Sequence, residues 1–123
     1  MSTNTICWTD IPVADLNRAV AFYTAVLGQT VQKQSHGNFE FGLFPHAEDN
    51  ASGCLFVMED TKPSLAGPLV YFSVEGRLDA AIEAARTGGG KLLQEKHPIG
   101  PYGFKAVIVD SEGNRVALHS KSP

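Results

Sequence analysis

The sequence predicts an α+β fold built from two tandem βαβββ modules. Three observations support this: a strand, tight turn and amphipathic helix near the N-terminus, a weaker copy of that unit in the second half, and short strand patterns after each helix. Val13 and Val74 end the two leading strands, and Gly28 and Gly89 close the two helices. Both pairs are 61 positions apart (74 − 13 and 89 − 28), and such a constant offset indicates a duplication.

A length of 123 residues suits one domain with a buried core. We therefore predict a single domain over residues 1–123, with a first module over about 4–60 and a second over about 68–121. The stretch from Asp60 to Pro68 includes two prolines, Thr, Ser and Gly, a composition typical of a linker. Each helix should cover one face of the strands in its own module.

The first module is expected to begin with a strand over residues 5–12. Asp15 is a suitable N-cap for the following helix, and Gly28 can end it because glycine adopts the left-handed conformation without penalty. The helix buries an apolar stripe with the spacing of one helical face, formed by Leu16, Ala19, Val20, Tyr23, Val26 and Leu27. Three more strands are expected at 30–34, 38–44 and 53–59, with a hairpin turn at 36–38 and a loop at 45–53.

The second module repeats this order. Its leading strand is expected over 69–75, and its helix carries apolar residues from Leu78 to Ala85 and stops at three consecutive glycines. The remaining strands are expected at 91–95, 104–109 and 114–120, with a loop at 98–103 and a glycine-containing turn at 110–113.

Composition narrows the class of protein. The net charge of −3 and the absence of a Lys/Arg cluster argue against a nucleic-acid partner or an anionic membrane surface. No signal peptide is visible at the N-terminus, and no apolar window reaches the roughly 20 residues that span a bilayer. Cys7 and Cys54 lack a CxxC spacing, so we expect two reduced, buried thiols in a cytoplasmic protein.

Three blocks of sequence carry a family resemblance. They are Ile11-Pro-Val-Ala-Asp-Leu-x-x-Ala-x-x-Phe-Tyr-x-x-Val-Leu-Gly28, Gly88-Gly-Gly-Lys91 and Asp110-x-x-Gly-Asn-Arg-Val-x-Leu-His119. In this order they resemble the glyoxalase/bleomycin resistance protein/dioxygenase superfamily, also called the vicinal oxygen chelate (VOC) fold. The resemblance implies βαβββ modules whose strands form a curved mixed sheet around a cup, usually completed in a homodimer.

In the metal-dependent members of that superfamily, four His, Gln or Glu ligands point into the cup. Carried over by motif, the ligand positions fall on Trp8, Leu69, Ala117 and, more loosely, Leu55 or Phe56. None of these side chains offers the nitrogen or oxygen lone pair that a divalent cation requires. We therefore expect no metal at these positions and no other cofactor.

Strand alternation predicts what faces the cup instead. An apolar and aromatic face with a few polar groups is typical of a small-molecule site, although the same residues would also suit packing against a partner module or subunit. Tyr102, in a loop flanked by glycines, is a candidate lid or simply part of a turn. The predicted ligand-binding residues are Trp8, Asp10, Phe56, Met58, Leu69, Tyr71, Tyr102, Arg115, Ala117 and His119, with Ser73 on the same face.

Two of these residues have a candidate chemical role. His119 is the candidate general acid or base, because imidazoles exchange protons near neutral pH, although a histidine on a terminal strand is more often a surface or rim residue. Arg115 is suited to anchor a carboxylate or phosphate, or else to pair with Asp10. A displaced metal site would need the loop residues His36, His46 and His97 with Glu40, Glu48 or Asp49, and these lack any metal-binding spacing.

The sequence thus supports three hypotheses. The first is a metal-free protein of this superfamily that binds a small apolar or aromatic molecule in the cup. The second is a glyoxalase-like lyase, isomerase or dioxygenase of the same superfamily with a non-standard metal site. The third is a dimeric interaction module without a ligand. In each case we expect a homodimer.

Overall fold

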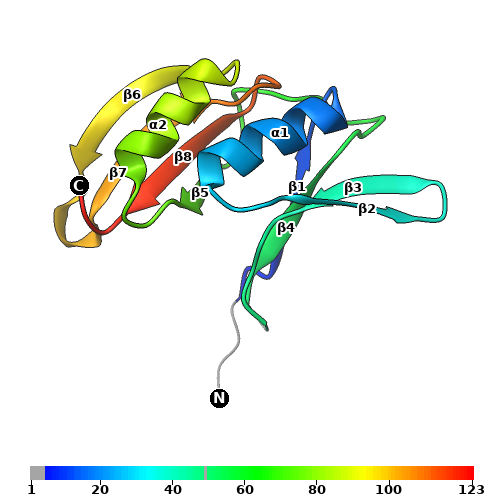
Figure 1. Ribbon diagram of the computed structural model, residues 1–123, viewed down its shortest axis with the longest axis horizontal. Coiled ribbons are helices and arrows are strands. Elements are labelled where there is room, and N and C mark those ends of the chain that lie inside the picture. The colour runs from blue at the N-terminus through cyan, green and yellow to red at the C-terminus, as the bar shows by residue number, and fades with distance from the viewer. Residues whose placement is uncertain (1–4, 49) are drawn as a thin grey trace.

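A computed structural model describes residues 5–48 and 50–123 of the protein (Figure 1). In the first half the elements follow the expected order of strand, helix and three strands. They are β1 (Trp8–Pro12), α1 (Leu16–Leu27), β2 (Gln32–His36), β3 (Phe39–Leu43) and β4 (Ser52–Phe56). The second half repeats that order with β5 (Val70–Ser73), α2 (Leu78–Thr87), β6 (Lys91–Pro98), a 3₁₀ turn η1 (Gly100–Tyr102), β7 (Phe104–Val109) and β8 (Arg115–Ser120).

Each half forms its own four-stranded mixed sheet. The strand order is β1-β4-β3-β2 in the first sheet and β5-β8-β7-β6 in the second, so the two sheets have the same topology. In both, the leading strand pairs in parallel with the last strand of its module, and the remaining pairs are antiparallel. The α+β fold of two βαβββ units, predicted from the repeat, is therefore confirmed.

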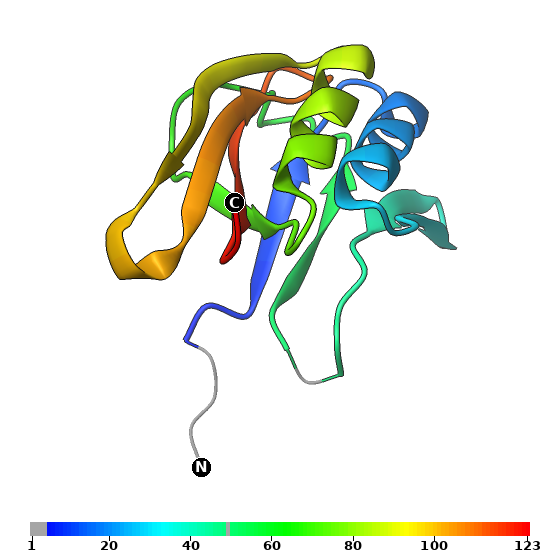
Figure 2. The same ribbon diagram turned by 60° about the vertical axis from the view of Figure 1, so that its left-hand side comes forward.

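Both helices lie on one side of the sheets and bury the shared core (Figure 2). Tyr23 of α1 is fully buried, and its ring lies 5.6 Å from that of Phe44 and 5.2 Å from that of Phe72. Because Phe44 belongs to the first half and Phe72 to the second, a single aromatic cluster joins the modules. The hydroxyl of Tyr23 donates to Oδ2 of buried Asp110 at 2.6 Å, and burial is the first reason that the pKa of Tyr23 is raised well above its ordinary value.

A second link between the modules lies at the start of α1. Oε1 of Glu112 accepts the backbone N–H groups of Ala14 at 2.9 Å and Asp15 at 2.8 Å, while Oε2 accepts from Nε of Arg18 at 2.7 Å. Burial alone would raise the pKa of Glu112, but these bonds, with one from Ser111, lower it to about 2. The second module therefore completes the N-terminus of the first helix.

The two helices end differently. Asp15 caps α1 by accepting from the N–H of Arg18 at 3.0 Å, and Gly28 ends the helix with φ of 70°, both as predicted. Helix α2 has no side-chain cap at its start, and its last turn closes on Gly88, with the left-handed residue one position later at Gly89. Helix α1 is 12 residues long and α2 is 10.

Several predicted boundaries were wrong for reasons of strand pairing. β2 was expected at 30–34 but runs over Gln32–His36, because its register with β3 is set by the turn at Gly37. β4 ends at Phe56 rather than residue 59, since its partner β1 ends at Pro12. β6 continues to Pro98 rather than 95, because β7 pairs with it as far as Phe104. No helix among the described residues is long and apolar enough to cross a membrane.

Candidate functional site

On the first sheet, the face turned away from the helices carries Trp8, Asp10 and Cys54. The register of β1 with β4 places Asp10 directly beside Cys54, while Ile11 and Leu55 point into the core. The indole Nε1–H of Trp8 donates to Oδ1 of Asp10 at 2.9 Å, and the Cys54 thiol lies 3.5 Å from the same oxygen. Trp8 nevertheless remains 47% exposed, so its ring is held in place but is accessible.

Cys54 is a protonated donor in this cluster. Burial, followed by the hydrogen bond to Asp10, raises the pKa of the Cys54 thiol to about 11. The expectation of two buried thiols was half wrong: Cys54 is buried, but Cys7 is exposed, because it precedes β1 and lies outside the core. Both are free thiols in the structure.

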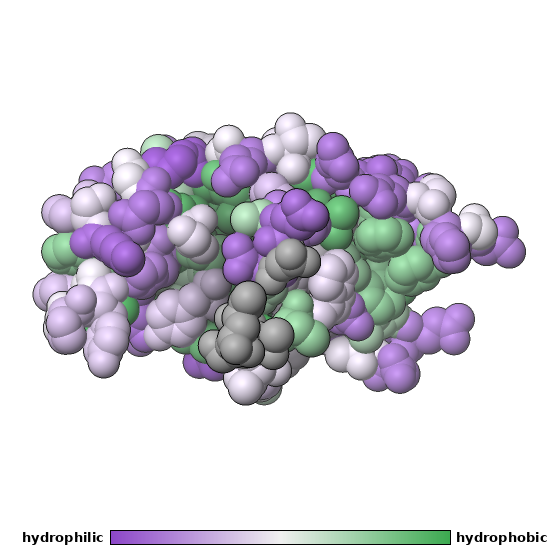
Figure 3. Space-filling view, turned by 90° about the horizontal axis from the view of Figure 1, so that it is seen from below, coloured by the Kyte–Doolittle hydropathy of each residue, from purple (hydrophilic) through white to green (hydrophobic). Residues whose placement is uncertain are grey.

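An aromatic row continues this face along the first sheet. Phe39 stacks on Phe41 with ring centroids 5.4 Å apart and meets Phe56 edge-on at 5.1 Å. Phe39 is 44% exposed, and Phe41 and Phe56 are half-buried. In Figure 3, hydrophobic surface gathers at the end of the molecule where the β2–β3 hairpin lies. The first module thus presents an apolar, aromatic face.

The equivalent face of the second sheet is more polar. Strand register places Tyr71 beside Ala117 and Ser73 beside His119, with Phe72 and Leu118 on the core side. A hollow of about 560 Å³ lies against this face, lined by Tyr71, Ser73, Ile99, Tyr102 and His119. From the sequence, Tyr71, Ser73 and His119 were expected on the cup face and Tyr102 was a candidate lid, whereas Ile99 was not named.

His119 connects β8 to the turn that carries Tyr102. The ring Nε2 of His119 lies 2.6 Å from the carbonyl oxygen of Tyr102. A carbonyl oxygen only accepts, so Nε2 carries the hydrogen and, in the neutral ring, Nδ1 keeps the lone pair. The same turn is closed by the N–H of Ile99, which donates to Gly103 at 2.8 Å. Tyr102 is therefore held by its backbone while its side chain stays 73% exposed.

Sequence reasoning missed Lys105. Its Nζ donates to the hydroxyl of Tyr71 at 3.0 Å and lies 5.4 Å from the centre of that ring. In the sheet, Lys105 pairs directly with His119. Alternation along residues 104–109 would have placed Lys105 opposite the core residues Phe104 and Ala106, so the signal was present in the sequence.

Arg115 lies on the same face at the start of β8. Its Nη2 donates to the carbonyl of Gly67 at 3.1 Å, and its buried Nε has no hydrogen-bond partner among residues 5–48 and 50–123. The alternative of an ion pair with Asp10 does not occur, because Asp10 accepts from Trp8 and Cys54 instead.

The predicted ligand-binding residues fall into two groups. Trp8, Asp10 and Phe56 lie on the first sheet, with half-buried Met58 just beyond β4. The second sheet carries Tyr71, Arg115, Ala117 and His119, with half-buried Leu69 just before β5 and Tyr102 in η1. Within the part of the chain that the structure describes, no hydrogen bond or aromatic contact joins the groups. Ala117 is fully buried between β5 and β7, so it contributes no open surface.

The residues at the family's ligand positions do not fit a metal ion. The indole of Trp8 donates its only polar hydrogen to Asp10, and Leu69 and Ala117 have no donor atoms. Among the described residues no group of three His, Cys, Asp or Glu side chains is arranged to bind a metal. In the loops, Nδ1 of His46 lies 3.1 Å from the Phe44 carbonyl and that of His97 lies 2.9 Å from the Glu95 carbonyl. Asp49, named for a displaced site, lies outside the described residues.

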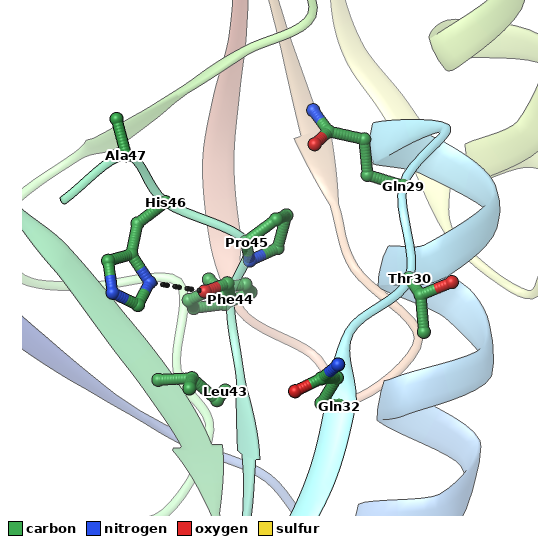
Figure 4. A pocket seen from close by; sticks show the side chains of 8 residues that line it. All are labelled: Gln29, Thr30, Gln32, Leu43, Phe44, Pro45, His46 and Ala47. Atoms are coloured by element: carbon green, nitrogen blue, oxygen red, sulfur yellow. Dashed lines mark hydrogen bonds between the residues drawn. The ribbon is translucent and has the colours of Figure 1, made fainter.

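A second hollow, of about 580 Å³, lies beyond the C-terminal end of α1 (Figure 4). Gln32 of β2 and Leu43 of β3 form one side, and the ring of His46 turns towards the Phe44 carbonyl. This hollow was not expected from the sequence, and its lining contains amides and a hydroxyl but no carboxylate, Lys or Arg. The lining residues are Gln29, Thr30, Gln32, Leu43, Phe44, Pro45, His46 and Ala47.

Comparison with known proteins gives a consistent result. The chain is 27% identical over 98% of its length to CFP32 of Mycobacterium tuberculosis, which carries a provisional glyoxylase name, and it covers 46% of that protein. It therefore spans about half the length of the curated relatives that it matches.

Solved structures agree on the fold. A glyoxalase/bleomycin resistance protein from Albidiferax ferrireducens superposes with a TM-score of 0.74 at 17% identity, covering 95% of this chain and 98% of the other. Glyoxalase I from Zea mays gives 0.68 at 21% identity, covering 94% of this chain and 45% of the plant enzyme.

The model of one protein family matches almost the entire chain, over residues 5–118. This range includes the first two sequence blocks that carried the resemblance and all of the third except its last residue, His119. The chain belongs to the Glyoxalase/Bleomycin resistance protein/Dioxygenase superfamily.

Proposed function

We propose that this chain binds a small apolar or aromatic molecule on the strand faces opposite its helices, without a metal at the superfamily's usual ligand positions. One observation carries the proposal: Trp8 stands at a ligand position, with its indole N–H fixed by Asp10 and half of its surface open. A fixed, accessible indole is a stacking surface that costs little conformational entropy on binding.

The surroundings of Trp8 support the same class of ligand. Phe39, Phe41 and Phe56 extend an apolar surface along the sheet, and the hollow at Tyr71 adds aromatic walls on the second sheet. Small-molecule sites are typically apolar with a few placed polar groups, which describes both faces. Asp10 has its Oδ1 occupied by Trp8 and Cys54, so we assign it to holding Trp8 rather than to contacting a ligand.

We also propose that two copies associate through these faces and that the protein works in the cytoplasm. The exposed aromatic row of the first sheet supports association, because a contiguous apolar patch is costly to leave in water. The free thiols of Cys7 and Cys54 suit a reducing compartment.

Trp8 supplies its own test, because it is the only tryptophan of the chain. A panel of uncharged planar aromatic compounds is titrated while indole fluorescence and the melting temperature are followed. We expect at least one compound to quench the fluorescence and raise the melting temperature of the wild type.

Two variants test whether the ligand binds at Trp8. Trp8→Phe keeps an aromatic surface and should retain the thermal shift, whereas Trp8→Ala should lose it while melting close to the wild type, because Trp8 is half-exposed. A panel without any effect on the wild type would refute the proposal. Global unfolding of Trp8→Ala would instead identify Trp8 as a structural residue.

A further inference from the structure

The second sheet face carries a positive charge, Lys105, that forms no ion pair with any residue the structure describes. Ion pairs within residues 5–48 and 50–123 involve Arg18, Lys33 and Lys96, but not Lys105. Lys105 is half-buried, and its ammonium is held at the Tyr71 hydroxyl rather than extended into water. An ammonium kept in place without a carboxylate is poised for an anion from outside the chain.

Tyr71 adds a second donor at the same point. Its hydroxyl oxygen accepts the hydrogen bond from Lys105 at 3.0 Å, so the hydroxyl proton remains available. The ammonium keeps two further N–H groups for a ligand. Two donors, one of them charged, therefore converge within one hydrogen-bond length of each other, a spacing that matches the two oxygens of a carboxylate.

The hollow beside this pair has walls suited to a planar molecule. The Tyr71 ring, Ile99 and Tyr102 line it, and its volume of about 560 Å³ lies within the range of small-ligand sites. The Tyr102 turn is tied to the sheet through His119. Arg115, on the same face and also without a carboxylate partner, adds to the positive potential.

We propose that this hollow binds a planar aromatic monocarboxylate, with the carboxylate on Lys105 Nζ and Tyr71 Oη and the ring against Ile99 and Tyr102. The proposal rests on the binding function proposed above and specifies its ligand class. Lys105 is a specificity-determining residue here, because it selects a charged ligand over an uncharged one of the same shape.

The test uses 2-naphthoate and 2-naphthamide, which share a ring system and differ in charge. Calorimetric titration of the whole chain should show naphthoate binding about tenfold or more tighter than the amide, as one charge-assisted hydrogen bond provides. In Lys105→Gln the preference should disappear, and in Tyr71→Phe it should fall in part. Lys33→Gln, which removes a lysine of the first sheet, is the matched control and should keep the preference. Inorganic phosphate should compete weakly, since it lacks the ring.

Each contrary result has a separate meaning. Equal affinities for the two probes, or a preference that survives Lys105→Gln, would overturn the carboxylate site while leaving the binding function standing. Failure of both probes to bind would also refute the site, and the Trp8 titrations would then decide the binding function independently.

Discussion

The two modules have the same strand order and share one core, yet they present different chemistry on their open faces. The first shows a row of phenylalanines and Trp8, and its one carboxylate, Asp10, has an oxygen occupied by its neighbours. The second shows Tyr71 and His119 lining a hollow, with Lys105 hydrogen-bonded to the Tyr71 hydroxyl. Duplication fixes the backbone and the buried side of each strand, because packing constrains both. The open side is free to diverge, and any function that distinguishes the modules should be sought there.

The largest expected effect on stability comes from removing Asp110, whose hydrogen bonds join the two modules. Oδ1 of Asp110 accepts the backbone N–H groups of Glu112, Gly113 and Asn114, and Oδ2 accepts the hydroxyl of Tyr23. Asp110→Ala leaves these donors without an acceptor, so we expect the free energy of unfolding to fall by about 3–4 kcal/mol. Urea denaturation followed by circular dichroism measures it.

Asp60→Ala, in an exposed turn, is the control for that measurement and should leave stability within about 0.5 kcal/mol of the wild type. If Asp110→Ala melted one half while the other stayed folded, the modules would be independent units, and the shared core would be contradicted.

Acid should weaken the contact between Glu112 and the start of α1. Its pKa is about 2 in the folded protein against an ordinary 4.5, so the folded state binds the proton more weakly than the unfolded state. The stabilisation is complete above about pH 5, is lost as the pH falls towards 2, and amounts to about 3 kcal/mol. Stability curves between these pH values should be flatter in Glu112→Gln. A variant with the wild-type slope would assign the acid sensitivity to other carboxyls.

The apolar face of the first module should control association. Phe39→Asp places a charge in the aromatic row, and we expect the proposed dimer to dissociate about tenfold or more readily in sedimentation velocity experiments. Glu40→Gln alters the next residue of the same strand, whose carboxylate pairs with Lys33, and should leave the dimer intact. A monomeric wild-type protein would remove the basis for this prediction.

The smallest expected effect is a difference in alkylation rate between the two cysteines near the open face of the first sheet. The raised pKa and burial of the Cys54 thiol predict slow alkylation at pH 8, while exposed Cys7 should react promptly. Mass spectrometry of iodoacetamide-treated protein distinguishes the two sites. Rapid labelling of Cys54 in the native protein would show that the cluster with Asp10 opens.

The sequence was sufficient wherever the signal was local. Helix α1 starts after Asp15 and ends at Gly28 as expected, because capping acts within a few residues. The repeat then predicted the same order of elements in both modules. Strand alternation correctly put Tyr71 and His119 on one face.

The predictions that failed depended on long-range strand pairing. Alternation could have placed Lys105 on the open face, but its contact with Tyr71 depends on β7 and β5 flanking β8, which no local pattern specifies. Ala117 shares the predicted face but is covered, since alternation gives the side of a sheet and not the exposure. The polar strand β2 was misplaced because its residues carry little preference of their own and follow the turn at Gly37.

The contact between Glu112 and the start of α1 also bears on the order of folding. Residues 14 and 15 find their hydrogen-bond acceptor almost a hundred positions downstream. During synthesis, the first helix is therefore exposed with an incomplete N-terminus until the last hairpin has emerged from the ribosome. A chain truncated before residue 112 would lose β8, the strand that joins β5 to β7 in the second sheet, together with Glu112, so we expect the two halves to complete their folding together.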